Sequence, residues 1–136
     1  PPRSTLFPYT TLFRSYRKGW QGYEGTDMEF SVDLLKPTLI HSLSINFPNN
    51  PSSWVLLPAT VKYEASVDGI TWTTLGTLNF EISPADVKEV KEVRISFPET
   101  TVRYIKVSAV SRKVLPSWHA FKDQPCWIFA DELVVE

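Results

Sequence analysis

Apolar and polar residues alternate along much of the chain, which is the pattern of β-strands that bury one face. In residues 27–34 the apolar side chains share one parity, namely Met28, Phe30, Val32 and Leu34. The same period of two predicts strands in residues 39–47, 61–67, 70–78 and 93–97. Residues 101–110 carry apolar side chains on both faces and residues 127–135 are apolar at nearly every position, as in strands covered on both sides. We therefore expect about seven strands and no helix of ordinary length.

Turn-forming residues separate these segments and limit how the strands connect. Asp68-Gly69 predicts a tight turn that joins residues 61–67 to residues 70–78 in a hairpin, because glycine readily adopts the positive φ that such turns need. Residues 83–92 lack an apolar stripe and are predicted to form a solvated connection. Strands with one apolar face need a second sheet to cover them, so the sequence predicts an all-β antiparallel β-sandwich. A jelly-roll strand order fits, and an immunoglobulin-like order stays open at this point.

The start of the chain differs from the rest. Residues 1–15 have no sustained alternation and contain Pro1, Pro2 and Pro8. They resemble the translated sequencing-adapter peptide found at the ends of predicted proteins in environmental sequence data, and such segments are excluded from fold reasoning. The alternative is a genuine short edge strand in residues 10–13. We expect residues 1–15 to be a non-native or disordered leader, and residues 16–136 to be one β-sandwich domain that lacks its native N-terminal strand.

The charge balance and the single cysteine exclude several classes of function. The chain has 14 Lys and Arg against 15 Asp and Glu, a net charge of −1, without the basic excess that binding to nucleic acid requires. No apolar run approaches the roughly 20 residues of a membrane-spanning helix. Cys126 is the only cysteine, so no disulfide can form within the chain. The sequence therefore predicts neither a nucleic-acid partner nor a membrane span.

Two long loops carry the residues that suit a ligand site, residues 48–58 and residues 111–126. The first contains Trp54, and the second contains Trp118 and His119 between prolines that limit its freedom. A sugar site needs a flat aromatic surface and a few fixed polar groups. Trp118 is predicted to supply the flat surface and His119 a polar group that contacts the sugar, with Trp54 as a second platform. Arg112 or Lys113 could donate further hydrogen bonds to a ligand. The alternative is that both tryptophans close the ends of the sandwich as core lids.

No motif in the chain supports catalysis. Its two histidines stand apart, and the sequence has no nucleophile elbow, phosphate-binding glycine loop or paired metal-ligand spacing. Asp131 and Glu132 are neighbours in a predicted strand, so their side chains are expected on opposite faces, where they cannot flank one bond. The sequence therefore predicts a binding domain and not an enzyme.

Two other polar residues are expected to have structural roles. His41 shares the parity of the apolar residues in its predicted strand, so it is expected to point towards the core as a hydrogen-bonded residue. Arg103 stands beside Tyr104 at the start of a predicted buried strand and is expected to pair with a carboxylate or stack on a ring.

Five stretches occur in the order of a known family. They are Trp20-Gln21-Gly22, the alternating strand that ends at Asp33-Leu34, Ser66-Val67-Asp68-Gly69-Ile70-Thr71-Trp72, Val102-Arg103-Tyr104-Ile105-Lys106-Val107 and Asp131-Glu132-Leu133. Through them residues 16–136 resemble the discoidin family, also called coagulation-factor type C domains. The resemblance is greatest to family-32 carbohydrate-binding modules appended to bacterial β-N-acetylhexosaminidases. It implies a galactose-binding-like jelly roll of two antiparallel sheets.

The resemblance also implies a function and a location. It implies a non-catalytic module that binds a glycan through aromatic loop residues, covalently linked to the catalytic domain of a secreted bacterial glycoside hydrolase. The expected location is extracellular, at the cell surface or periplasmic. Family members often hold a structural calcium, and Glu132 matches their glutamate ligand. Their other ligands come largely from an N-terminal loop, which falls here in the region of residues 1–15.

Two other functions stay open on the sequence alone. One is an accessory sandwich that only packs against its own catalytic domain. The other is protein or lipid recognition through the same loops, for which Val55-Leu56-Leu57 is a candidate apolar tip. The sequence does not name the sugar, the parent enzyme or the oligomeric state.

Overall fold

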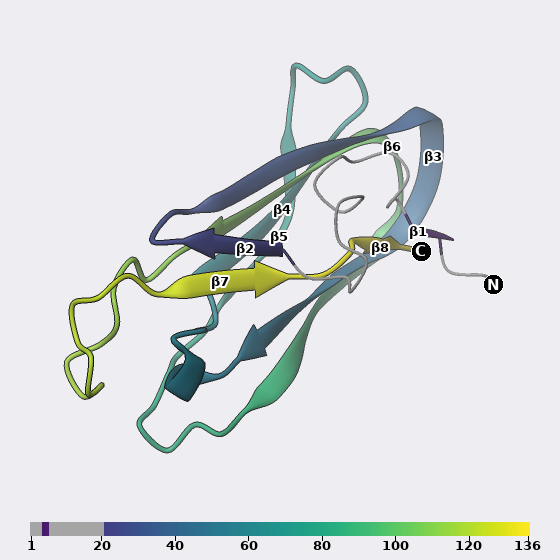
Figure 1. Cartoon of the computed structure of the whole chain (residues 1–136). Coiled ribbons are helices and arrows are strands. Elements are labelled where there is room, and N and C mark those ends of the chain that lie inside the picture. Colours follow the sequence, from purple (N-terminus) through teal and green to yellow (C-terminus); the bar gives the residue numbers. More distant parts are fainter. Residues whose placement is uncertain (1–3, 6–20) are drawn as a thin grey trace.

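Two 22-residue strands, β3 (Met28–Asn49) and β6 (Glu89–Val110), organise the fold. They pair antiparallel along almost their whole length, and Figure 1 shows β3 curving round one end of the molecule. Register shifts between Asp33 and Thr38 and between Ile40 and Ser42 mark this bend. Bulges of this kind bend a strand without ending it. For this reason the strands predicted in 27–34 and 39–47 are one continuous strand, and those in 93–97 and 101–110 are another.

The structure is a computed structural model that describes residues 4–5 and 21–136. The other elements are β1 (Ser4–Thr5), β2 (Gln21–Glu24), η2 (a 3-10 helix, Pro51–Ser53), β4 (Thr60–Ser66), β5 (Thr73–Asn79), β7 (Trp127–Ala130) and β8 (Val134–Val135). Within this described part there is no α-helix, and no helix that could cross a membrane. Two residues of the predicted leader form β1, which pairs with β8. The alternative strand in residues 10–13 lies outside the described residues, and the leader stays a prediction.

The strands form an antiparallel sandwich. The main sheet has the order β1-β8-β3-β6-β4-β5, and β2 pairs with β7 in a small second sheet. Because β3 and β6 bend, the main sheet folds over on itself (Figure 1). The first half of β3 pairs with the second half of β6 beside β4 and β5, whereas its second half pairs with the first half of β6 near β8. This architecture confirms the predicted all-β antiparallel β-sandwich.

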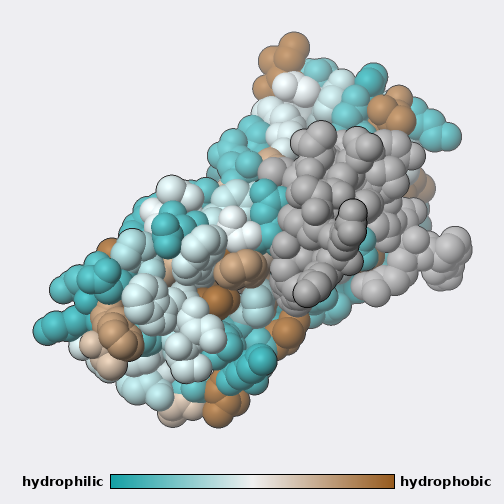
Figure 2. Space-filling view, in the orientation of Figure 1, coloured by the Kyte–Doolittle hydropathy of each residue, from teal (hydrophilic) through white to brown (hydrophobic). Residues whose placement is uncertain are grey.

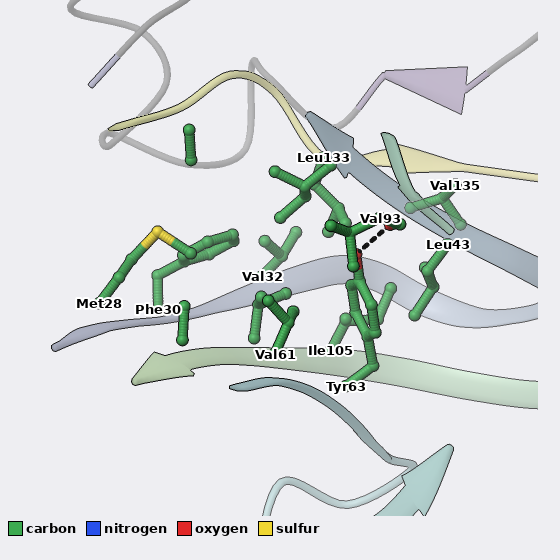
Figure 3. Close-up of a cluster of buried hydrophobic side chains, with 14 of the residues drawn as sticks. Met28, Phe30, Val32, Leu43, Val61, Tyr63, Val93, Ile105, Leu133 and Val135 are labelled. Atoms are coloured by element: carbon green, nitrogen blue, oxygen red, sulfur yellow. Dashed lines mark hydrogen bonds between the residues drawn. The ribbon is translucent and has the colours of Figure 1, made fainter. Parts of the chain in front are cut away.

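Buried side chains from both layers fill the interior (Figure 3). Met28, Phe30 and Val32 are all buried, as their shared parity predicts. Tyr63, from β4, is also buried, and its hydroxyl donates a hydrogen bond to the main-chain oxygen of Val93 at 2.7 Å. Burial raises the pKa of the Tyr63 phenol well above its ordinary value of 10.0. The neutral hydroxyl thus joins β4 to the first half of β6, across the core.

Asp68 organises the loop between β4 and β5. Its Oδ1 accepts hydrogen bonds from the main-chain N–H groups of Ile70 at 2.8 Å and Thr71 at 2.9 Å. It also accepts one from the Ser66 hydroxyl at 3.0 Å. Gly69 has a φ of 78°, and its N–H donates to the Ser66 oxygen at 2.8 Å. The predicted hairpin is confirmed, with a loop longer than a two-residue turn.

These hydrogen bonds predict a pH-dependent contribution of Asp68 to stability. The main-chain N–H groups of Thr71 and Ile70 hold the pKa of its carboxyl below the ordinary value of 3.8. A carboxyl with a lowered folded-state pKa stabilises the fold above its unfolded-state pKa, and loses that effect as the pH falls through the folded-state value. Asp68→Ala is therefore expected to lower the unfolding temperature near neutral pH and to have a smaller effect well below pH 3.8. Thermal melts of both proteins across this range test it, with Glu99→Ala as an exposed control; an equal effect at every pH contradicts it.

Two sequence predictions about polar residues have opposite outcomes. His41 is exposed, so the prediction that it points towards the core is wrong. A register shift directly beside it in β3 reverses the parity of the positions that follow. The structural role of Arg103 is confirmed, because it donates to both carboxylate oxygens of Asp33 at 2.9 and 3.1 Å. Its guanidinium carbon also lies 5.0 Å from the ring centre of Tyr104.

The final strand predicted in residues 127–135 is divided into β7 and β8. Between them, Asp131 accepts hydrogen bonds from the main-chain N–H of Asn46 at 2.9 Å and from its side-chain nitrogen at 2.8 Å. Burial raises the pKa of the Asp131 carboxyl. Asp131 and Glu132 therefore lie in the irregular segment between β7 and β8, so the prediction that they face opposite sides of a strand is wrong.

Candidate functional site

The two loops with the predicted platform residues meet at one end of the sandwich. The ring centres of Trp54 and Phe121 are 5.4 Å apart, those of His119 and Phe121 are 6.1 Å apart, and those of Trp118 and His119 are 6.2 Å apart. We call these four residues the aromatic rim. Trp54, Trp118 and His119 thus lie together, although the two loops are distant in the sequence. Phe121 was not predicted, and its signal was a third aromatic side chain in the same loop.

The four rings are not equally exposed. Trp118 and Phe121 have 37% and 57% of their surface exposed. Trp54 is half-buried and packs against a small second core of Leu56, Leu115 and Cys126. Trp54 therefore has the contacts of a lid, whereas Trp118 and Phe121 face solvent as a ligand platform requires.

The main chain around Trp54 is fixed by a tight turn. Asn50 and Val55 exchange main-chain hydrogen bonds of 2.8 and 3.1 Å on either side of η2. Trp54 has a φ of 67°, a left-handed conformation, and its N–H donates to the Pro51 oxygen at 3.0 Å. Its own oxygen accepts from the N–H of Trp127 at the start of β7. The sheet thus positions the Trp54 ring directly.

His119 joins the second loop to the first. Its Nε2 lies 2.8 Å from the main-chain oxygen of Pro51, and its Nδ1 accepts a hydrogen bond from the N–H of Phe121 at 3.0 Å. Since Nδ1 accepts, the ring proton is assigned to Nε2, which donates to Pro51. Both ring nitrogens are thereby used within the protein. The geometry makes His119 a positioning residue for the rim, and a direct contact of His119 with a sugar stays a prediction.

Arg112 and Lys113 are tied to the scaffold. The Arg112 guanidinium donates to the main-chain oxygens of Leu57, at 3.1 Å, and Phe80. Burial lowers the pKa of Arg112. Lys113 forms an ion pair with Asp27, and this pair, with the N–H of Ser111, holds the pKa of the Asp27 carboxyl below its ordinary value. The structure does not bring either basic residue to the rim, and their predicted hydrogen bonds to a ligand stay untested.

A groove of about 490 Å³ runs along the exposed side of the rim. Three loops line it, through Pro51, Ser52, Pro84, Asp86, Trp118, His119, Ala120 and Phe121. Asp86 comes from the connection between β5 and β6, and its Oδ2 accepts from the N–H of Ser83 at 2.9 Å and the side chain of Asn49 at 3.3 Å. The sequence predicted only a solvated connection there, and nothing in its pattern indicates that it meets the aromatic loops. The arrangement combines flat aromatic surface with a few fixed polar groups and has the features of a small-molecule site.

Val55-Leu56-Leu57 is not an exposed apolar tip. Leu56 and Leu57 are 1% and 5% exposed and belong to the two cores, and Val55 is half-buried. On the face in Figure 2, hydrophobic residues form small separate patches among hydrophilic ones. The choice of this tripeptide for protein or lipid recognition is therefore wrong.

Glu132, the predicted calcium ligand, is half-buried after β7. Residues 4–5 and 21–136 contain no group of three or more His, Cys, Asp or Glu side chains that could hold a metal ion. Calcium binds six to eight oxygen ligands, and main-chain oxygens can supply several of them. The described carboxylates alone do not form the site, and calcium binding stays a prediction.

The family model described as the F5/8 type C domain matches residues 8–123, most of the chain. The chain belongs to the F5/8 type C domain family. This membership confirms the resemblance to discoidin, or coagulation-factor type C, domains. The match begins within the segment predicted to be a leader. A comparison with curated proteins finds no match for this F5/8 type C domain.

Solved structures share the fold of this F5/8 type C domain at low sequence identity. The chitosan-binding module 1 from a chitosanase/glucanase of Paenibacillus sp. IK-5 is 17% identical, with a TM-score of 0.60 over 98% of this chain and 87% of the module. A pectin-binding carbohydrate-binding module is 19% identical, with a TM-score of 0.56 over 92% of this chain and 76% of that one. A CBM32 module from Clostridium perfringens, solved in complex with GalNAc-β-1,3-galactose, is 13% identical, with a TM-score of 0.54 over 91% and 80% of the two chains. The domain thus has the predicted galactose-binding-like jelly-roll fold.

Proposed function

We propose that this F5/8 type C domain is a non-catalytic carbohydrate-binding module, and that the groove along the aromatic rim is its glycan site. The observation that carries the proposal is the pair of solvent-facing rings, Trp118 and Phe121, beside polar groups from three loops. The C–H faces of a sugar ring pack on such aromatic surfaces, and nearby polar groups orient its hydroxyls. His119 and Trp54 hold the platform in place.

The nature of the structural relatives supports this proposal. The solved modules with this fold are described as binding chitosan, pectin and GalNAc-β-1,3-galactose. These glycans differ in charge and linkage, so they support the ligand class and not one sugar. Calorimetric titration with neutral, cationic and acidic oligosaccharides tests the proposal, and a folded domain that binds none of them contradicts it.

We further propose that the domain acts as a partner of a catalytic domain in the same chain, a bacterial glycoside hydrolase of the β-N-acetylhexosaminidase type. Its location would be extracellular, at the cell surface or periplasmic. Binding of the module to the glycan would raise the effective concentration of substrate at the linked active site. The alternative is an accessory sandwich that only packs on the catalytic domain. That arrangement predicts burial of Trp118 and Phe121 at a domain contact, so protection of these residues from solvent in the full-length protein distinguishes the two.

We also propose that Glu132 is a ligand of structural calcium. If so, calcium should raise the stability of the folded domain. A ligand that binds only the folded state at a hundred times its dissociation constant stabilises by about 2.7 kcal/mol. Calcium is therefore expected to raise the unfolding temperature of the unchanged protein by several degrees and to have little effect on Glu132→Gln. Thermal melts with calcium or magnesium test it, with Glu29→Gln as an exposed control. The same response in Glu132→Gln, or none in the unchanged protein, contradicts the proposal.

A further inference from the structure

Most side-chain hydrogen-bond donors that line the groove are used within the protein. His119 Nε2 donates to the Pro51 oxygen, and the Ser52 hydroxyl donates to Asn50 Oδ1 at 2.9 Å. Among the side chains that line the groove, only the indole N–H of Trp118 remains as a donor. The Ser52 hydroxyl donates its one hydrogen bond to Asn50, but its oxygen can still accept a hydrogen bond from a ligand. The polar side chains of the groove therefore present mainly acceptors.

Asp86 adds a negative charge to this set of acceptors. Its Oδ2 accepts from Ser83 and Asn49, and within the described part of the chain no group donates to its Oδ1. It is the only Asp, Glu, Lys or Arg among the residues that line the groove. A carboxylate that lines a groove beside aromatic rings favours a ligand that carries a positive charge.

The nearby cations do not supply a compensating donor inside the groove. Arg112 is close enough to Asp86 to interact electrostatically, but its guanidinium donates to the main-chain oxygens of Leu57 and Phe80 and does not line the groove. Lys113 is paired with Asp27. Lys88 lines a separate groove together with Glu89, and Lys122 is exposed next to Phe121 but is not among the residues that line this groove. A sugar carboxylate in the groove would thus face Asp86 without a cation to bind it.

We infer that the groove prefers glycans that carry a free, protonated amine, meaning amino sugars without the N-acetyl group. This inference rests on the proposed function, because it names the substrate class of the same site. An ammonium group donates up to three hydrogen bonds, and the Asp86 carboxylate and the Ser52 hydroxyl are acceptors that line the groove. N-acetylation removes the charge and two of these donors. A uronic acid adds a second negative charge next to Asp86 and is disfavoured.

The test compares three oligosaccharides of equal length on the whole chain: glucosamine oligomers, their N-acetylated counterparts and oligogalacturonate. Calorimetry is expected to show the glucosamine oligomer binding about tenfold more tightly than the N-acetylated one, with oligogalacturonate weakest, because charge-assisted hydrogen bonds are the strong ones. Asp86→Asn keeps an oxygen for Ser83 and is expected to remove most of this preference, roughly five- to tenfold. Added salt is expected to weaken binding of the glucosamine oligomer only. Asp123→Asn, an exposed carboxylate outside the groove, is the control for general charge effects.

The outcomes separate this inference from the proposed function. Equal or tighter binding of N-acetylated or acidic oligomers by the unchanged protein overturns the amine preference and leaves glycan binding intact. The inference is also overturned if Asp123→Asn loses as much of the preference as Asp86→Asn. That result would mean that the amine responds to the overall negative charge of the domain and not to a contact with Asp86. Absence of binding to all three oligomers defeats the proposed function itself. A thermal melt of Asp86→Asn tests whether the variant is folded. If it is not, the order of affinities of the unchanged protein for the three oligomers still decides the amine preference.

Discussion

Trp118→Ala is expected to weaken glycan binding by about ten- to thirtyfold with little loss of stability. Truncating an aromatic side chain at the centre of a binding site commonly costs more than about 1 kcal/mol, and a loss of about 1.4–2 kcal/mol corresponds to this range. The Trp118 ring is already exposed in the free protein and lies on the platform and not in the core. Its removal therefore takes away contact area for the sugar and leaves the loop hydrogen bonds of His119 in place. Calorimetric titration with the best-bound oligosaccharide measures the loss.

Two other tryptophans serve as controls for this experiment. Trp72 lies in the loop between β4 and β5, away from the rim, with the Lys106 ammonium 4.2 Å from its ring centre. Trp72→Ala is expected to leave the affinity unchanged. Trp54→Ala is expected to lower both affinity and unfolding temperature, because Trp54 also packs against the second core. Unchanged affinity in a folded Trp118→Ala protein would exclude the rim as the glycan site.

Tyr63→Ala is expected to cost about 3–5 kcal/mol of unfolding free energy, since a large buried ring is removed from the centre of the core. Folded domains are stable by only about 5–15 kcal/mol, so this variant is expected to lose a large share of its stability. Tyr63→Phe keeps the ring and removes only the hydroxyl, which donates a hydrogen bond to the main-chain oxygen of Val93. Its expected cost is about 1–3 kcal/mol, because buried polar groups lose their partner.

Urea unfolding followed by tryptophan fluorescence measures both changes. Tyr104→Phe is a matched control, because Tyr104 is only half-buried and its ring contacts the guanidinium of Arg103. This control is expected to change stability by less than about 0.5 kcal/mol. Equal effects of Tyr63→Phe and Tyr104→Phe would mean that the hydroxyl does not contribute as a link between the layers.

Local sequence patterns predicted the strands well where the period of two was uninterrupted. Met28, Phe30 and Val32 are buried as their parity requires, and the Asp68-Gly69 hairpin forms. Parity failed at His41, because a register shift in a bent strand reverses which face a residue occupies. The division between β7 and β8 depends on Asn46, which lies 85 positions from Asp131. Such a contact is set by the tertiary fold and has no local signal.

The site was predicted only in part, because local patterns show which residues a loop carries but not which other loops it meets. Aromatic residues in proline-containing loops indicated a platform, and the structure brings Trp54, Trp118 and His119 together. The sequence could not show that Arg112 bonds main-chain oxygens of two other loops. Nor could it show that Asp86 faces the same groove, because this depends on where the connection between β5 and β6 lies beside the aromatic loops.

The long pairing of β3 with β6 has a consequence for how the chain reaches its native state. Met28 pairs with Ala109, so the ladder closes only after most of the chain is available. Bringing such distant partners together loses chain entropy before the contacts form, and topologies of this kind fold in milliseconds to seconds. A nascent chain on the ribosome therefore has to expose its apolar strand faces until β6 has been synthesised.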